Sequence, residues 1–307
     1  MTDQLKKYLF QDHSARVQAV RLAQSWQTGL AHQSHPPCVR RLLGELVSAA
    51  VLLASNIKFE GSLVLQLQGD GPVSLVVVEC TADLSIRATA TLREGHDLPA
   101  DGTLQTLLNT QGKGRFIVIL DPSRKSADMQ PYQGVVPLEG DTVAQVLEQY
   151  MRDSEQLDTR LWLGADASHS AGLLLQRLPD QGGAPSGGAL AASDTWERAQ
   201  ALAGTLTPDE LLDLDTDTLV HRLFWEETLV AFEPRGVRWW CPCTRERVAN
   251  MLRMLGRGEV EDILAERAHI DVSCNFCGKP YRFDAIDCAQ LFIQPQDSPR
   301  ASGGAVH

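Results

Sequence analysis

The sequence predicts an α+β protein: a mixed, mainly antiparallel sheet core domain with helices, then a helical linker and a small C-terminal four-cysteine domain. Three observations support this fold class. Residues 84–92 alternate between apolar and polar side chains, which is the period of a half-buried antiparallel strand. Apolar residues in 39–54 recur three and four positions apart, as in an amphipathic helix. Four of the seven cysteines form two tight pairs near the C-terminus.

Residues 1–178 are expected to form the core domain. The helix over 39–54 begins after Pro36 and Pro37, and strands are predicted over 63–67, 74–79 and 84–92, the first two joined by a Gly-Asp-Gly-Pro turn. A strand over 115–120 is expected to close at Asp121-Pro122. A second amphipathic helix over 143–151 follows, with Thr142 and Gln145 spaced as a capping box. Short strands over 161–163 and 172–178 complete this part. Neighbouring strands with helices between them disfavour a doubly wound parallel sheet.

Residues 179–232 are expected to be a flexible segment followed by a helical linker. The stretch 179–193 is rich in Gly, Pro, Ala and Ser, as linkers are. Thr207, Pro208 and Glu210 mark a helix start, and a further amphipathic helix is expected over 217–229, with no strand in this part. These helices are too few to form a core alone and should pack on the first domain. Residues 233–294 form the third unit, and 295–307 a disordered tail.

The charge balance disfavours polyanionic partners. The chain has 307 residues with 28 Lys and Arg against 39 Asp and Glu, a net charge of −11. Phosphate backbones and anionic membranes repel such a protein, so neither nucleic acid nor a membrane is an expected partner. The N-terminus lacks the apolar run of a signal peptide, and 46–54 falls short of the ~20 apolar residues that span a bilayer. We therefore expect a cytoplasmic protein.

Two cysteine pairs carry the clearest chemistry in the sequence. Cys241 and Cys243 flank one residue, and after 30 further residues Cys274 and Cys277 flank two. Four thiolates suit one tetrahedral Zn²⁺ per chain, so these are the candidate metal ligands. The site is either a purely structural zinc site or a redox switch, because zinc keeps all four sulfurs as oxidisable thiolates. Each pair can close its own disulfide, and the two cross-pairings stay open, since four cysteines allow three connectivities.

Other candidate residues have simpler interpretations. Cys38 and Cys80 are expected to be small buried hydrophobes, whereas Cys288 lies near the zinc unit and is set apart from them for that reason. His269 precedes Cys274 by five residues, but four cysteines already fill the coordination sphere of zinc. Aromatic residues near the cysteines should cover a small zinc core rather than stack on bases: Trp239, Trp240, Tyr281 and Phe283. Arginines near the site should form a solvated face: Arg235, Arg238, Arg245 and Arg247. No catalytic constellation is present in the sequence, so no enzyme is expected.

With these motifs the chain resembles the redox-regulated 33 kDa chaperonin family of heat-shock holdases. Core-domain signatures of that family are similar to residues 65–72 (LQLQGDGP), 131–140 (PYQGVVPLEG) and 154–160 (SEQLDTR). Its zinc site is similar to Cys241-x-Cys243 with the following Thr-Arg-Glu-Arg, and to Cys274-x-x-Cys277 with Gly278. The resemblance covers about residues 3–294. Cys38, Cys80 and Cys288 lie outside the family motif.

The resemblance implies a bacterial cytosolic chaperone that is reduced, zinc-bound and inactive at rest. Peroxide or hypochlorite with heat would oxidise the pairs to Cys241–Cys243 and Cys274–Cys277 disulfides and release zinc. The zinc domain and the linker would then unfold and expose a client-binding surface. The protein would hold unfolded or partly folded client proteins without ATP, and it would form a homodimer on activation.

Two hypotheses from other classes compete with this one. A thiol–disulfide oxidoreductase would use Cys274 and Cys277, but this Cys-x-x-Cys does not open a helix after a strand as thioredoxin-like units require. A zinc-ribbon nucleic-acid-binding module would need a basic surface, which the acidic balance disfavours.

Overall fold

The computed structural model describes residues 3–56, 60–122, 130–179 and 188–292. The contacts divide the chain into two units, residues 1–241 and 242–307, each described here by itself. The predicted tail 295–307 lies outside the described residues, and so does most of the predicted flexible segment, residues 180–187. The last residues of that segment are helical, because a helix begins at Gly188.

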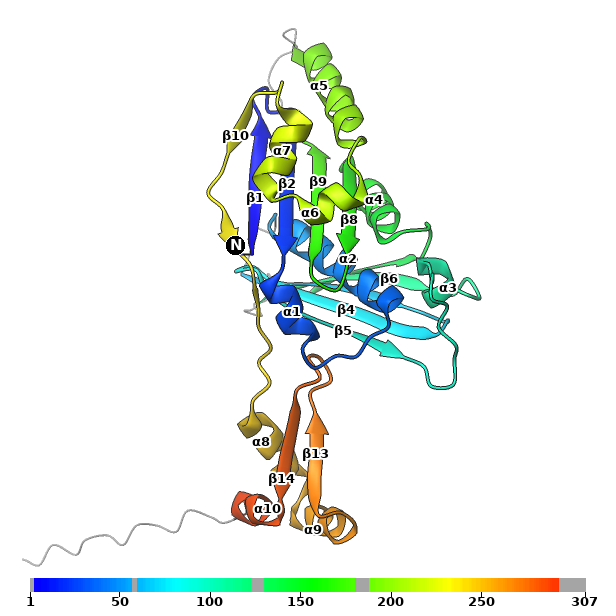
Figure 1. Cartoon of the computed structure of the whole chain (residues 1–307), viewed down its shortest axis with the longest axis vertical. Coiled ribbons are helices and arrows are strands. Elements are labelled where there is room, and N and C mark those ends of the chain that lie inside the picture. Colours follow the sequence, from blue (N-terminus) through cyan, green and yellow to red (C-terminus); the bar gives the residue numbers. More distant parts are fainter. Residues whose placement is uncertain (1–2, 57–59, 123–129, 180–187, 293–307) are drawn as a thin grey trace, which may run out of the picture. The chain divides into compact units, whose positions relative to one another are not determined.

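One antiparallel sheet of the first unit contains strands from the beginning and from the end of the predicted core domain, residues 1–178 (Figure 1). Its strand order is β10-β1-β2-β9-β8, and β11 also pairs with β1. The expected strands at 161–163 and 172–178 lie in β8 and β9, whereas the two N-terminal strands were not predicted. The bounds are β1 (Gln4–Phe10), β2 (Ala15–Leu22), β8 (Thr159–Ala165), β9 (Ser170–Arg177), β10 (Leu229–Ala231) and β11 (Arg235–Gly236).

The second sheet of this unit has the order β12-β5-β4-β3-β6-β7. All pairs are antiparallel except β12 with β5. The strands expected at 63–67, 74–79, 84–92 and 115–120 are confirmed, although β6 continues through Asp121 to Pro122 because Gly61 pairs with Pro122. The bounds are β3 (Gly61–Gln68), β4 (Val73–Thr81), β5 (Ser85–Leu92), β6 (Arg115–Pro122), β7 (Tyr132–Pro137) and β12 (Arg238–Trp239).

The predicted central helix is α2 (Pro37–Ala54), which contacts strands of both sheets. Pro37 occupies its first turn, where a missing N–H costs nothing. Most of its residues are buried in the main hydrophobic core. The helix expected at 143–151 is α4 (Val143–Asp153); Thr142 caps it, but Gln145 accepts from the N–H of Asp141, so the predicted reciprocal capping box is wrong. Two short helices were not predicted: α1 (Gln24–Leu30) and α3 (Leu104–Leu108).

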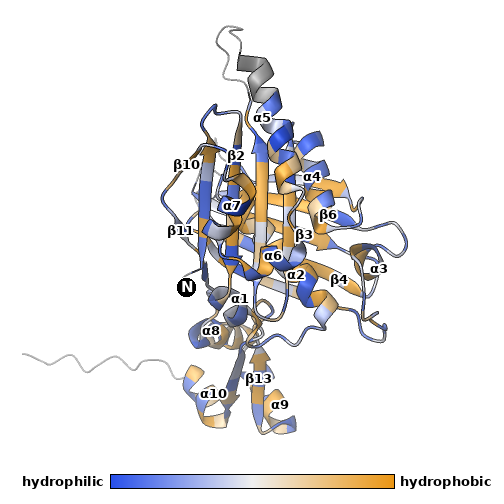
Figure 2. Cartoon of the chain, turned by 45° about the horizontal axis from the view of Figure 1, so that its top comes forward, coloured by the Kyte–Doolittle hydropathy of each residue, from blue (hydrophilic) through white to orange (hydrophobic). Residues whose placement is uncertain are grey.

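Helices of the linker cover the other face of the first sheet, as expected. They are α5 (Gly188–Ala203), α6 (Pro208–Asp213) and α7 (Thr216–Phe224). Their apolar side chains form a second core with Phe10 of β1 and with apolar side chains of β2 and β9. Figure 2 shows hydrophobic stretches on the strands that lie beside α6 and α7. The helix predicted over 217–229 ends earlier, at Phe224, and the prediction that this part has no strand is wrong. Leu229 belongs to β10, where it pairs with Phe10.

The second unit is a hairpin with three helices. Its elements are α8 (Arg245–Leu255), α9 (Arg257–Glu266), β13 (His269–Ser273), β14 (Pro280–Asp284) and α10 (Ala285–Leu291). Helices α8 and α9 lie between the two cysteine pairs in the sequence, and the hairpin was not predicted. Its core is small, with seven buried residues among those described: Ala249, Leu252, Val260, Ile270, Tyr281, Phe283 and Cys288.

Candidate metal centre

The four paired cysteines come together in space. One sulfur from each of Cys241, Cys243, Cys274 and Cys277 lies within 4.8 Å of the others, so the four can hold a metal ion. The Sγ atoms of Cys243 and Cys277 are 3.4 Å apart, and none of the four cysteines is joined in a disulfide. A zinc ion with bonds of ~2.3 Å to a sulfur tetrahedron separates the sulfurs by ~3.8 Å. Both the spacing and the all-sulfur donor set therefore fit Zn²⁺.

A tight hairpin turn positions the second pair. Cys274 and Cys277 lie between β13 and β14, where the N–H of Cys274 donates to Lys279 O at 3.0 Å. The N–H of Gly278 donates back to Cys274 O at 2.9 Å, and Gly278 has a φ of 70°. This left-handed conformation favours glycine, so the turn explains why a glycine follows the second cysteine pair. Because the pair does not open a helix, the turn also lacks the geometry of a thioredoxin-like motif.

The start of α8 positions the first pair. Thr244 accepts from the N–H of Arg247 at 3.2 Å and caps this helix directly after Cys243. The Arg247 guanidinium donates to Pro242 O at 3.0 Å, and the Tyr281 hydroxyl donates to Cys243 O at 2.9 Å. The hydrogen bond at Cys243, together with desolvation of the phenol, raises the pKa of Tyr281. These bonds tie the first pair to the strand that follows the second pair.

Two of the four flanking aromatic residues cover the site core as predicted, and two do not. Tyr281 and Phe283 are buried in the small core, with the Arg245 guanidinium 4.1 Å from the centre of the Phe283 ring. Trp239 instead packs against the main core of the first unit, because β12 pairs with β5. Trp240 is 52% exposed. The prediction is therefore wrong for both tryptophans, since the chain before Cys241 is held by the larger sheet.

The remaining candidates are not part of the cysteine cluster. His269 contacts Asp271, at 2.9 Å, and does not belong to the group of close ligand atoms. Cys38, Cys80 and Cys288 are all buried, as small hydrophobic residues are. Burial raises the pKa of the thiols of Cys80 and Cys288, which keeps both protonated and poorly reactive.

Arginines around the site have structural partners. Arg235 donates to Ala82 O, and Arg238 donates to Asp83 at 2.7 Å. Arg245 donates to Asp287 at 2.7 Å. These contacts, with that of Arg247 to Pro242, engage all four arginines that a nucleic-acid module would direct at phosphates. They therefore favour the solvated structural face that the sequence predicts.

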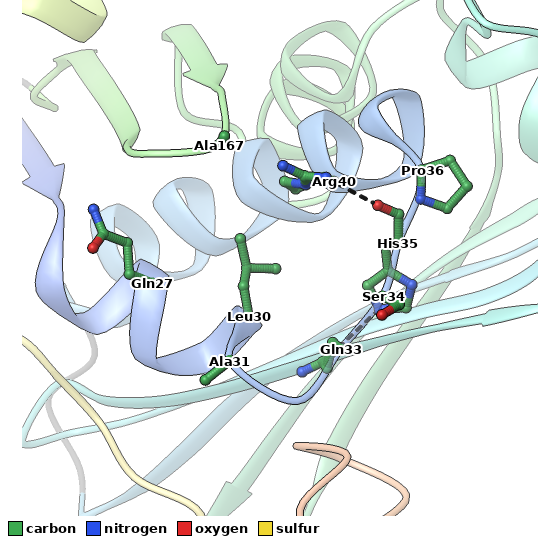
Figure 3. A pocket seen from close by; sticks show the side chains of 9 residues that line it. All are labelled: Gln27, Leu30, Ala31, Gln33, Ser34, His35, Pro36, Arg40 and Ala167. Carbon is green, nitrogen blue, oxygen red and sulfur yellow. Dashed lines mark hydrogen bonds between the residues drawn. The ribbon is translucent and has the colours of Figure 1, made fainter.

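A cavity of about 570 Å³ lies in the first unit, between α1, α2 and the β8–β9 turn (Figure 3). Its polar side chains are engaged with one another or with the backbone. Gln33 donates to Gly29 O at 3.0 Å and contacts a ring nitrogen of His35 at 2.8 Å. Arg40 donates to His35 O at 3.2 Å, and burial lowers the pKa of His35. The lining groups thus hold the loop before α2 and identify no ligand.

The fold and site together define a two-sheet α+β protein with a covered sheet face and a C-terminal four-thiol centre. The sequence model described as Hsp33 protein matches residues 3–284. Proteins named 33 kDa chaperonin are similar over nearly the whole chain. That of Methylobacillus flagellatus is 45% identical over 95% of both chains, and that of Chromobacterium violaceum 44% identical over 94% of both. The chain therefore belongs to the Hsp33 family, which supports a chaperone function.

A solved structure supports the fold assignment. The crystal structure of the 33 kDa chaperonin from Thermotoga maritima superposes with a TM-score of 0.74 and covers 94% of this chain and 97% of its own. Because the two sequences are only 21% identical, this similarity supports the fold and assigns no function. Among the described residues, none of the helices is both long enough and apolar enough to cross a membrane.

Proposed function

We propose that this chaperone is a redox-regulated, ATP-independent holdase of the cytoplasm. In the reduced state Cys241, Cys243, Cys274 and Cys277 hold one Zn²⁺ as thiolates, and the protein is inactive. Oxidation forms Cys241–Cys243 and Cys274–Cys277 disulfides, releases the zinc and exposes a surface for unfolded client proteins. The observation that carries the proposal is the convergence of four cysteine sulfurs within 4.8 Å of one another.

The chemistry of the switch involves the sulfurs alone. When bound, zinc keeps the thiols deprotonated and supplies folding free energy to a small domain. Four thiolates lose four electrons and form two S–S bonds, while two molecules of hydrogen peroxide take up those electrons with four protons and leave as four waters. Each local disulfide closes a loop of only three or four residues, so chain entropy favours it little and reductants can reverse it.

Loss of the metal site has a large consequence because the second unit is small. Structural zinc contributes ~10–16 kcal/mol of apparent binding free energy. A whole domain is stable by only about 5–15 kcal/mol. With seven described buried residues in its core, the second unit cannot replace that contribution. We therefore expect the part of the proposed switch domain (233–294) that lies in the second unit to unfold when the four thiols are oxidised.

The helical linker, which covers one face of the first sheet, is the part that would open next. It is joined to Cys241 by short strands that lie on the first unit: β10, β11 and β12, of two or three residues each. Before them, α7 is held by an edge-to-face contact of Phe224 with Phe10, at 5.7 Å between ring centres, and by Asp217, which accepts from Tyr8 at 2.9 Å. Opening would expose the apolar faces of α5–α7 and of strands β1, β2 and β9.

Such a surface suits clients of many sequences. The covered face is built from aliphatic and aromatic side chains with little charge. The segment after α7 also exposes large apolar residues in the closed state, with Trp225 67%, Phe232 53% and Trp240 52% exposed. Extended apolar area of this kind binds partly unfolded chains by burial rather than by sequence. We expect a homodimer to form in the active state and no binding to nucleic acid or membranes.

The test follows zinc release and client protection in the same samples. Reduced, zinc-loaded protein is titrated with hydrogen peroxide at raised temperature, with zinc read by a chromophoric chelator and client aggregation by light scattering. We expect about one equivalent of zinc per chain to leave as protection rises. A Cys38→Ala variant serves as control, since Cys38 is buried in α2 outside the cluster. Zinc that stays bound, or leaves with no gain in protection, would contradict the switch.

Two readouts separate the competing functions. Turnover in an insulin-reduction assay would favour a thiol–disulfide oxidoreductase. A salt-dependent shift with DNA or RNA would favour a zinc-ribbon module.

A further inference from the structure

A second cavity, of about 220 Å³, lies beneath the linker helix α6. It is lined by residues of α2, the start of α4, strand β8 and α6 with the residues just before it, all within the first unit, and it is partly open to solvent. Leu161 and Leu163 line it from the sheet, and Leu206 and Leu211 from the linker. Leu211 is 3% exposed, so the cavity is part of the contact that holds α6 on the sheet.

Glu45 of α2 contributes the one titratable side chain among the described residues that line this cavity. The described residues offer its carboxyl group neither a hydrogen bond nor a close ion pair. Burial raises the pKa of Glu45 to about 7, and the charge of Arg41, one turn earlier on α2, opposes that rise in part. Glu45 is half-buried, so its carboxylate is less favourable here than in open water, and the neutral carboxylic acid is favoured by comparison.

Charged groups next to the cavity are engaged elsewhere. Arg41 donates to Gly102 O at 2.9 Å. On α6, Glu210 pairs with Arg222 at 2.6 Å, and at β8 and α4 Arg160 pairs with Glu148 at 3.3 Å. The other charged residues next to the lining segments in the sequence are acidic: Asp141, Asp209 and Asp213.

We propose that Glu45 and the cavity around it form a pH-sensitive latch, which holds α6 on the sheet while the carboxyl is protonated and loosens it when the carboxyl is charged. The latch acts on the same linker that the proposed function opens, so its regulatory meaning rests on that function. The physical basis of the latch does not depend on that function, because the carboxyl group, the cavity and α6 are all present in the resting protein.

The direction of the effect follows from proton linkage. Closed protein binds a proton on Glu45 more tightly than open protein, where the carboxyl meets water and has a lower pKa. Closure is therefore favoured at low pH, and opening increases with pH until it levels off above the closed-state pKa near 7. Between the two pKa values the opening constant rises by up to ~tenfold per pH unit. Glu210, Asp215 and Asp217 have lowered pKa values, so their stabilising contacts weaken only at more acidic pH.

The experiment is hydrogen exchange on the full, reduced, zinc-loaded chain, without oxidant or client. Protection factors of the amides in α6 are measured from pH 5.5 to 7.5, after correction for the pH dependence of chemical exchange. We expect α6 protection in the wild type to fall at least ~tenfold over this range. In Glu45→Gln, which keeps the shape and removes the charge, we expect protection that does not vary with pH.

Two further variants make the result decisive. Glu94→Gln removes a carboxylate from an exposed loop and should keep the wild-type slope. Glu45→Met replaces the carboxyl group by an apolar group of similar length and should also remove the slope, which covers the case that the amide of Glu45→Gln disturbs packing. A flat wild-type profile, or an unchanged slope in both Glu45 variants, would overturn the latch. Neither result bears on zinc release or client protection, so the proposed function fails only in its own assay.

Discussion

Replacing Phe224 by alanine should open the linker without any oxidant. Phe224 is 2% exposed and meets Phe10 edge to face with ring centres 5.7 Å apart. Truncating a buried phenylalanine costs about 3–5 kcal/mol, and about 0.5–1.5 kcal/mol of such a loss belongs to the aromatic pair itself. If the loss falls on docking of α7, the opening constant rises roughly 10²- to 10³-fold. The reduced variant should then suppress client aggregation although zinc remains bound.

Trp225→Ala is the matched control, since it removes the adjacent aromatic side chain, which is 67% exposed. We expect it to change linker opening by less than ~0.5 kcal/mol. The assay combines exchange of the α7 amides, binding of an apolar dye and client light scattering, all on reduced protein. Phe224→Leu, a milder truncation, serves if the alanine variant does not fold. The reasoning would be refuted by a folded Phe224→Ala protein with freely exchanging α7 amides and no gain in client protection.

Three further predictions address the metal site and the cover. Cys277→Ser should lower bound zinc well below one equivalent and destabilise the second unit, whereas Cys288→Ala should keep the zinc; chelator titration and thermal unfolding check both. Thr207→Ala removes a reciprocal capping box and should weaken α6 by about 1 kcal/mol, read as lost amide protection in α6 alone. Replacing glycine by alanine normally stabilises a helix. In Gly29→Ala, however, the new Cβ would lie 2.5 Å from the Trp239 ring, so we expect faster amide exchange in β12. Unchanged exchange would contradict this.

Helices and strands with a strong local sequence pattern could be predicted from the sequence. Elements that form only by pairing with distant segments of the chain could not. Helix α2 and strand β5 show clear periodicity, and both formed as expected. Strand β10 could not be foreseen, because its three residues continue an apolar helical pattern and become a strand only by pairing with β1. The cysteine cluster was predictable because thiol spacing reports a shared metal directly. Glu45 carried no such signal, since its burial depends on the distant linker residues 206–211.

The stability of the cover is uneven, and this fixes the order in which it should open. The helices of the linker are well anchored, since Thr207 and Asp215 cap α6 and α7, and the apolar faces of both belong to a contiguous core. The strands between α7 and Cys241 are short, and Val230 and Phe232 point large apolar surface outward. Segments with few buried contacts open at low free-energy cost.

Unfolding that begins at Cys241 first has to release Val237 and Trp239 from the main core, and it then meets the weakest part of the cover at residues 229–232. Loss of β10 removes one edge of the first sheet and leaves β1 paired with β2 alone where β10 had covered Tyr8–Phe10. The contact between Phe10 and Phe224 is then the next to be exposed, because Phe10 lies on the strand that β10 covered. Under the proposed function, exchange in β10–β12 should precede exchange in α7, and exchange in α6 should come last unless Glu45 is charged.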